Sequence, residues 1–227
     1  MRLKNLIKWD IQFQIKYGFY LIYALVTVLY IVLLSAFPPT WREKAAAIMI
    51  FSDPAAMGLF FMGAIVLLEK SQRVLNSLAV SPIKVTEYIL SKVISIGVIS
   101  VFVAFILAVA GNIRPILPVL IGTGLSSVMF TLLGLIAATK IVSLNQFILV
   151  TAPIEIICFA PPILYSFDSG PMILRCYPIS LCMGMIMGKA DDIFPGVISS
   201  ILVIVILYMV VYQFTLKMWK SVGGAKL

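Results

Sequence analysis

The sequence predicts an all-α, polytopic membrane protein with six transmembrane helices. Of its 227 residues, 62% are apolar and 11% are charged, whereas soluble domains are roughly 45–50% apolar and about 25% charged. The mean hydropathy is +1.13. So few charges cannot cover an apolar core of this size, which excludes a soluble monomer, a disordered chain and a small disulfide scaffold.

Six apolar runs are long enough to cross a bilayer, which takes about 20 residues in helical form. The runs are continuously apolar and do not alternate, so they predict helices rather than the strands of a barrel. We find no internal repeat, and we interpret residues 1–227 as one transmembrane domain. The predicted spans are 18–36, 45–68, 87–110, 116–139, 147–164 and 193–214.

The basic residues predict the orientation of these spans. With the N-terminus inside, twelve of the 17 lysines and arginines fall in inner segments and five in outer segments. The positive-inside rule expects such an excess on the cytoplasmic side. We therefore expect both termini in the cytoplasm. We also expect the chain in the cytoplasmic (inner) membrane of a prokaryote. The net charge of +8 thus needs no nucleic-acid partner to explain it.

The N-terminal segment, residues 1–17, has the pattern of an interfacial amphipathic helix. Its apolar residues recur every four positions beside a row of lysines, which suits a helix lying at the lipid headgroups. We weigh two interpretations: an anchor on the membrane surface, and an elbow helix that contacts a cytoplasmic partner. The apolar positions are Leu3, Ile7, Ile11 and Ile15.

Several kinds of chemistry are missing from the sequence. It has no histidine, the commonest general base and metal ligand. It has no phosphate-binding loop of the G-x-x-x-x-G-K-[ST] type. Cys158, Cys176 and Cys182 lack metal-ligand spacing, so we expect no metal site; Cys176 and Cys182 either pair or stay free thiols. We expect no catalysis by this chain and no cofactor bound to it, and favour transport or recognition.

The loop at 69–86, between the second and third spans, predicts a short amphipathic helix. Val74, Leu75 and Leu78 share one side of this helix, and Pro82 ends it because proline cannot continue a helix. Such an apolar turn on a cytoplasmic loop suits docking into a partner's cleft. An ordinary interfacial loop has the same pattern.

The same region resembles the signature region of permease subunits of the type-2 ABC exporter class. The resemblance lies in Glu69, the Leu75/Leu78 pair, Ser81-Pro82-Ile83 and the Glu87–Lys92 stretch. Members often carry Gly-Thr soon after the acidic residue, where this chain has Arg73-Val74. The resemblance implies a cytoplasmic coupling helix that receives force from an ATPase. The implied coupling residues are Glu69, Arg73, Val74, Leu75, Leu78, Ser81, Pro82, Glu87 and Lys92.

Two short motifs, Phe51-Ser52-Asp53-Pro54 and Ser143-Leu144-Asn145-Gln146-Phe147, are similar to small permeases associated with export of fluoroquinolones or other drugs. The resemblance to the exporter class implies a half-transporter in which two permease copies form the pathway, and we expect a drug-like or amphiphilic small molecule as its substrate. A separate ABC ATPase subunit would bind ATP and Mg²⁺. A haem-export permease is a neighbouring alternative within the same class.

Two carboxylates lie within apolar runs, where a charge is costly unless it faces a cavity or a partner. Asp53 and Glu155 are therefore candidates for the substrate pathway. For Asp53 we favour a structural role, as the N-cap of a helix restarting at Pro54. Glu155 is expected to line a cavity in a fifth helix broken by prolines. A proton-driven secondary carrier using both carboxylates is the alternative from another class.

The segment at 165–192 is too long for a tight turn, and its prolines and glycines divide it into short pieces. We expect it on the outer side, either re-entrant or lying on the surface. It would gate the exit of a pathway or cap the helix bundle.

Overall fold

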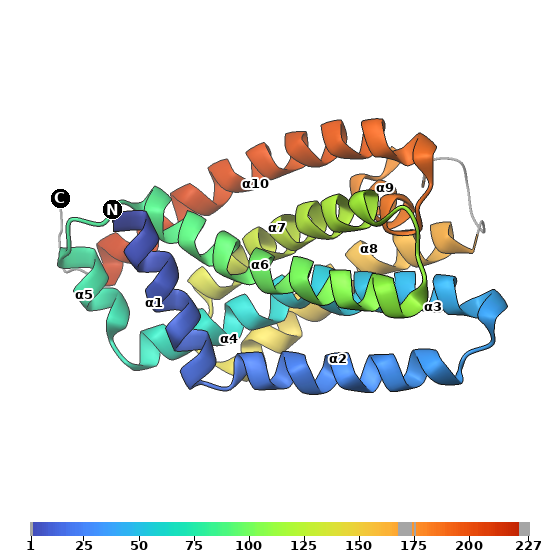
Figure 1. The fold of residues 1–227 in the computed structure, drawn as a ribbon. Helices are drawn as coiled ribbons and strands as arrows, with labels where there is room; N and C mark the ends of the chain where they lie inside the picture. The colour runs from blue at the N-terminus through green and yellow to red at the C-terminus, as the bar shows by residue number, and fades with distance from the viewer. Residues whose placement is uncertain (1, 168–173, 175, 223–227) are drawn as a thin grey trace.

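The computed structural model describes residues 2–167, 174 and 176–222, and this part of the chain is helical with short connections (Figure 1). The principal elements, in chain order, are α1 (Arg2–Lys16), α2 (Phe19–Ala36), α3 (Pro39–Ile50), η1 (Phe51–Ala55), α4 (Met57–Ser71), α5 (Val74–Val80), α6 (Val85–Gly111), α7 (Ile116–Lys140), α8 (Leu144–Ser166), α9 (Pro178–Ile186), η3 (Ala190–Asp192) and α10 (Ile193–Val222).

The structure confirms the six predicted spans, since six helical stretches in the described residues are long and apolar enough to cross a membrane. The second stretch, Pro39–Ser71, begins earlier than predicted because α3, η1 and α4 follow one another directly. The last stretch, Ala190–Lys220, runs on past the predicted end near residue 214. These differences arise because polar residues at helix ends continue the backbone hydrogen bonding after the apolar run has stopped.

Helix α7 lies at the centre of the bundle and packs against α4, α6 and α10. Close approach depends on small residues along its length. A Cβ placed on Gly134 would lie 2.5 Å from the Leu59 carbonyl oxygen of α4, and one on Gly122 would lie 2.9 Å from the Cys182 carbonyl oxygen of α9. Membrane helices use small residues in this way to bring backbones together.

Helix α1 crosses the long helices steeply at the end of the molecule where α5 also lies (Figure 1). It packs mainly against α6, and its buried residues are Leu6, Asp10, Phe13 and Gln14. The predicted stripe of Leu3, Ile7, Ile11 and Ile15 lies beside this face and remains half-buried or exposed. The apolar stripe is therefore available to lipid. The neighbouring face, which carries both apolar and polar buried residues, packs against the bundle.

The described part of the predicted outer segment folds into the opposite end of the bundle. Residues Ile179 to Ile186 of α9 are buried, with α7, α8 and α10 around them. The Tyr165 hydroxyl donates to Asp192 Oδ2 at 2.5 Å, which joins the end of α8 to η3, directly before α10. The helix therefore inserts into the bundle and does not lie on its surface. Residues 168–173 and 175 lie outside the described residues.

Candidate functional site

The structure brings Glu69 and Lys92, two of the residues singled out by sequence, into a buried charge cluster with Asp10. The Lys92 ammonium forms ion pairs with both carboxylates, and its distance to Asp10 Oδ1 is 2.5 Å. The Tyr88 hydroxyl donates to the second oxygen of Glu69 at 2.7 Å. All four side chains are at most 1% exposed. One ammonium thus holds together α1, the last turn of α4 and the second turn of α6.

The surroundings of Lys92 compensate for its burial in two further ways. The rings of Trp9 and Tyr88 lie 5.6 and 5.1 Å from its nitrogen, within the range of a cation–π attraction. One turn along both helices, the Gln14 amide donates to the Ser95 hydroxyl at 2.9 Å. A buried charge is strongly destabilising unless it is paired and hydrogen-bonded. The cluster therefore depends on all of its members.

Asp10 is the member of this cluster that sequence analysis missed. It was passed over because the segment was interpreted through its isoleucine stripe and its lysines. The signal that marks it is its isolation, since it is the one acidic residue between positions 1 and 42. Lys92 carries the matching signal, because it is a lone cation inside a predicted span.

Lys70, which follows Glu69, is hydrogen-bonded to a different helix, α7. Its ammonium donates to the carbonyl oxygens of Ala138, Thr139 and Ile141 at 2.7, 3.1 and 2.8 Å. These carbonyls belong to the C-terminal end of α7, where a cation satisfies unpaired acceptors and complements the helix dipole. The last turn of α4 is thus attached to α6 and α1 through Glu69 and to α7 through Lys70.

The helix predicted on the loop at 69–86 is present as α5, but its apolar side faces inward. Leu75 and Leu78 are 1% and 9% exposed and belong to one apolar cluster with Met218 and Trp219 of α10. Val74 is half-buried beside this cluster. The expectation that this apolar face is open for docking is therefore not met, because the protein itself covers it.

The exposed side of α5 is polar. Arg73, Asn76 and Ser77 are exposed, and Arg73 adopts a left-handed backbone conformation with φ of 57° that turns the chain from α4 into α5. The Gln72 amide donates to the Tyr17 hydroxyl, so this turn also touches the end of the N-terminal segment. Any partner that meets α5 from outside contacts this polar side.

The remaining predicted coupling residues lie in the segment that connects α5 to α6. The Ser81 hydroxyl donates to the Leu78 carbonyl oxygen at 2.7 Å, and the Pro82 carbonyl accepts from Arg2 of α1 at 3.0 Å. Glu87 accepts from the Lys84 backbone N–H at 2.9 Å, as an acidic side chain does when it caps the first turn of a helix. The segment between α5 and α6 is therefore hydrogen-bonded to α1 at one point and to α6 at another.

Asp53 does not cap a restarted helix, contrary to the sequence-based prediction. It lies in the π-helical turn η1, and both flanking residues, Ile50 and Ala56, keep right-handed helical backbone angles. Helix α4 begins only at Met57, with no side-chain cap. A π-turn widens the helix locally without breaking it, so the proline at position 54 is accommodated inside a continuous rod.

The fifth helix is likewise continuous, although we expected it to be broken. Helix α8 includes Pro153, Pro161 and Pro162 without interruption, since spanning helices tolerate proline where neighbours satisfy the freed carbonyls. Glu155 is half-buried, and Ile156 and Ile157 beside it are exposed. One carboxyl oxygen of Glu155, Oε1, is nevertheless buried and has no hydrogen-bond partner among the described residues, so the place of Glu155 at a cavity stays a prediction.

The whole described chain can be placed by comparison with known proteins. A family model described as the fluoroquinolones export permease protein family matches residues 1–222. This chain belongs to that family. The permease is also 25% identical over 166 residues to proteins named fluoroquinolones export permease protein in two Mycobacterium tuberculosis strains, CDC 1551 and H37Rv. Each alignment covers 72% of this chain and 70% of the relative.

Membership gives the permease a general role in export across a membrane, consistent with its six spans. The matched residues 1–222 contain the whole charge cluster and α5.

Proposed function

We propose that this chain is the membrane subunit of an ATP-driven ABC exporter for drug-like, amphiphilic molecules such as fluoroquinolones. Two copies form the pathway, and a separate ATPase subunit carries ATP and Mg²⁺. The α5 end, with both termini, faces the cytoplasm of a prokaryotic cell. Support comes from the excess of basic residues in the segments at this end and from the export permease family.

The observation that carries this proposal is the way α5 is held. Four helices meet around it: α4 precedes it, α6 follows it, α10 covers its apolar side, and α1 reaches its exit through Arg2. The Asp10–Glu69–Lys92 cluster then connects α1, α4 and α6 to one another. A push on α5 is therefore transmitted to four helices together, as an ATPase-driven change of access requires.

The exposure of each residue in and around α5 indicates its role in this coupling. Arg73, Asn76 and Ser77 form the polar side that meets the ATPase. Leu75 and Leu78 transmit its movement to α10 through buried contacts. Packed interiors deform little, so a displacement at one face is passed on and not absorbed. Val74, Ser81, Pro82 and Glu87 fix the orientation of α5 in this scheme.

The test is a reconstituted complex with the partner ATPase, in which ATP hydrolysis and fluoroquinolone transport are both measured. Arg73→Glu with Ser77→Trp changes only the exposed side of α5, so the subunit should fold normally. We expect drug-stimulated hydrolysis to fall to the level of the ATPase alone, and transport to stop. Normal stimulation by this variant would refute the coupling role.

A matched control places the same bulk on another loop. Asn145 is exposed in the first turn of α8, which follows the α7–α8 loop on the predicted cytoplasmic side. Asn145→Trp should leave hydrolysis and transport unchanged. If both loops respond equally, the effect is not specific to α5. Transport that survives ATP depletion and stops with an uncoupler would instead favour a proton-driven carrier.

A further inference from the structure

A hollow of about 280 Å³ lies along the C-terminal half of α1, against the turn that leads from α4 to α5. The residues that α1 contributes recur every three or four positions, a spacing that places side chains on one face of a helix. The turn contributes a glutamine. The lining is Trp9, Gln12, Phe13, Lys16, Tyr17 and Gln72. Polar and aromatic groups are thus combined in one small concavity.

This hollow lies at the depth of the lipid headgroups. Helix α2 is a span, and α1 joins it through Gly18, whose φ of 78° turns the chain. Helix α1 therefore crosses the spans at one end of the bundle (Figure 1). Trp9 and Tyr17 in the lining are both exposed, and such amphipathic rings are enriched where acyl chains meet headgroups and water.

The charge of the hollow is positive. Lys16 is exposed and forms no ion pair with any described residue. Its nitrogen lies 5.9 Å from the centre of the Tyr17 ring, which lines the same hollow. Gln12, one turn earlier, is also exposed and carries an amide donor, and no carboxylate of the described chain is in the lining. An ammonium with a neighbouring amide favours a phosphate-bearing anion over a cation.

A second hollow, of about 360 Å³, adjoins the first at Tyr17, which lines both. It lies between the start of α2, the last turns of α4 and the start of α8. Apart from Tyr17 and Ser71, its lining is apolar: Phe19, Ala64, Leu67, Leu68 and Leu144. Along α4 the lining extends from Ser71 back to Ala64, about 10 Å into the span at 1.5 Å per residue. A polar hollow at headgroup depth is thus continued by an apolar one inside the bilayer.

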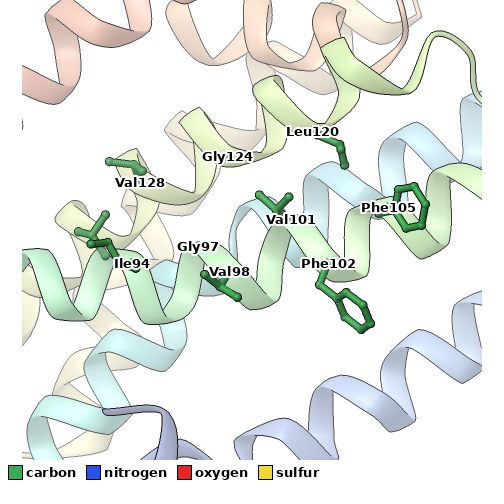
Figure 2. Close-up of a pocket in the computed structure, with 10 residues that line it drawn as sticks. Ile94, Gly97, Val98, Val101, Phe102, Phe105, Leu120, Gly124 and Val128 are labelled. Carbon is green, nitrogen blue, oxygen red and sulfur yellow. The ribbon is translucent and has the colours of Figure 1, made fainter. Parts of the chain in front are cut away.

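The groove between α6 and α7 lacks this combination. Its volume is about 680 Å³, and its lining residues are all apolar (Figure 2). Gly97 lies in this groove with open space at its Cβ. Such a groove accepts a hydrocarbon chain but selects no headgroup, so it serves as a control for the paired hollows.

We propose that the two adjoining hollows bind one glycerophospholipid with an anionic headgroup. Its phosphate lies against Lys16 and the Gln12 amide, and one acyl chain follows Leu67 and Leu68 of α4. The lipid is a resident ligand of the permease and not its cargo, so this site does not depend on the proposed export function. Because the polar hollow is shared by α1 and Gln72, the bound headgroup joins α1 to the turn before α5.

The first test measures headgroup selectivity by native mass spectrometry of the purified permease in a neutral detergent. The probes are phosphatidylglycerol and phosphatidylcholine with identical acyl chains, titrated separately. We expect phosphatidylglycerol to bind about tenfold or more tightly, as a charge-assisted contact provides. Lys16→Gln should remove most of this preference. Lys8→Gln, which neutralises an exposed lysine of the same helix outside both hollows, should preserve it.

The second test concerns the acyl chain. Ala64→Phe fills the apolar hollow, and Leu144→Ala removes part of its exposed wall. Each should weaken phosphatidylglycerol binding by about three- to tenfold, since apolar contact with the chain is lost. Two controls should leave binding unchanged: Gly97→Phe in the α6–α7 groove, and Leu149→Ala, which changes an exposed leucine of α8 outside the hollow.

Three results would overturn this proposal. Equal binding of the two lipids, or equal effects of Lys16→Gln and Lys8→Gln, would show only general attraction to a basic surface. Displacement of the lipid by inorganic phosphate, with no effect of Ala64→Phe or Leu144→Ala, would assign the polar hollow to a free anion. Each variant is first checked by size-exclusion chromatography. Leu144→Ala changes only an exposed side chain, so it decides the question if Ala64→Phe misfolds.

Discussion

Removal of the Lys92 ammonium tests whether the buried charge cluster of Asp10, Glu69 and Lys92 holds α1, α4 and α6 together. Lys92→Met keeps the length and apolar stem of the side chain but leaves Asp10 and Glu69 as buried carboxylates without a cation. All three side chains are at most 1% exposed, so water cannot replace the lost partner. Breaking a buried ion pair from one side costs about 3–5 kcal/mol. We expect a loss of stability at the upper end of this range, because two carboxylates lose their partner.

The matched variant removes all three charges together: Asp10→Asn, Glu69→Gln and Lys92→Met. This triple variant leaves no unpaired buried charge, although the two amides remain buried polar groups that need hydrogen-bond partners, so it should recover part of the lost stability. Unfolding is followed by tryptophan fluorescence in denaturant titrations of detergent-purified protein. Trp9 and Trp219 report on the cluster, since Trp9 lies beside Lys92 and Trp219 contacts Tyr88. The reasoning is refuted if Lys92→Met costs less than about 1 kcal/mol, or if the triple variant is no more stable than the single one.

Two further predictions concern the opposite end and the centre of the bundle. Cys176 is exposed while Cys182 is buried, and burial raises the pKa of the Cys182 thiol, which lowers its thiolate fraction at neutral pH; a membrane-impermeant maleimide added outside intact cells should label Cys176 and not Cys182. Labelling of Cys176 only after the inner side is opened would reverse the proposed orientation. Gly134→Ala should cost about 1–3 kcal/mol by overpacking, because its Cβ would meet the α4 backbone. Gly97→Ala is the control, and equal melting temperatures for the two variants would contradict the close α4–α7 contact.

The spans could be predicted from sequence because their cause is local. A continuous run of about 20 apolar residues has few alternatives to a spanning helix. The existence of α5 and its C-terminal end were also accessible, since Pro82 ends any helix that precedes it. The side that α5 buries was not accessible, because Leu75 and Leu78 form their cluster with α10, more than a hundred positions away.

The failures at the prolines have a common origin. Proline disfavours a helix interior in water, and the predictions of a restart at Asp53 and a break near Glu155 applied that rule. Inside a membrane the backbone has no water to bond with, so the chain keeps its helix and widens or adjusts a single turn. Asp10 escaped prediction for a different reason. Its partner Lys92 is 82 residues away, and no local pattern joins them.

The adjacent Glu69 and Lys70 restrict how α4 can move. Successive residues on a helix point about 100° apart, and here the Glu69 side chain is held by Lys92 and Tyr88 of α6 while the Lys70 side chain is held by the end of α7. Rotation of α4 about its own axis would break the contacts of either Glu69 or Lys70. Sliding along the axis would strain both. The motion that these contacts permit is a tilt of α1, α4, α6 and α7 as one block, together with α10, which packs against α7.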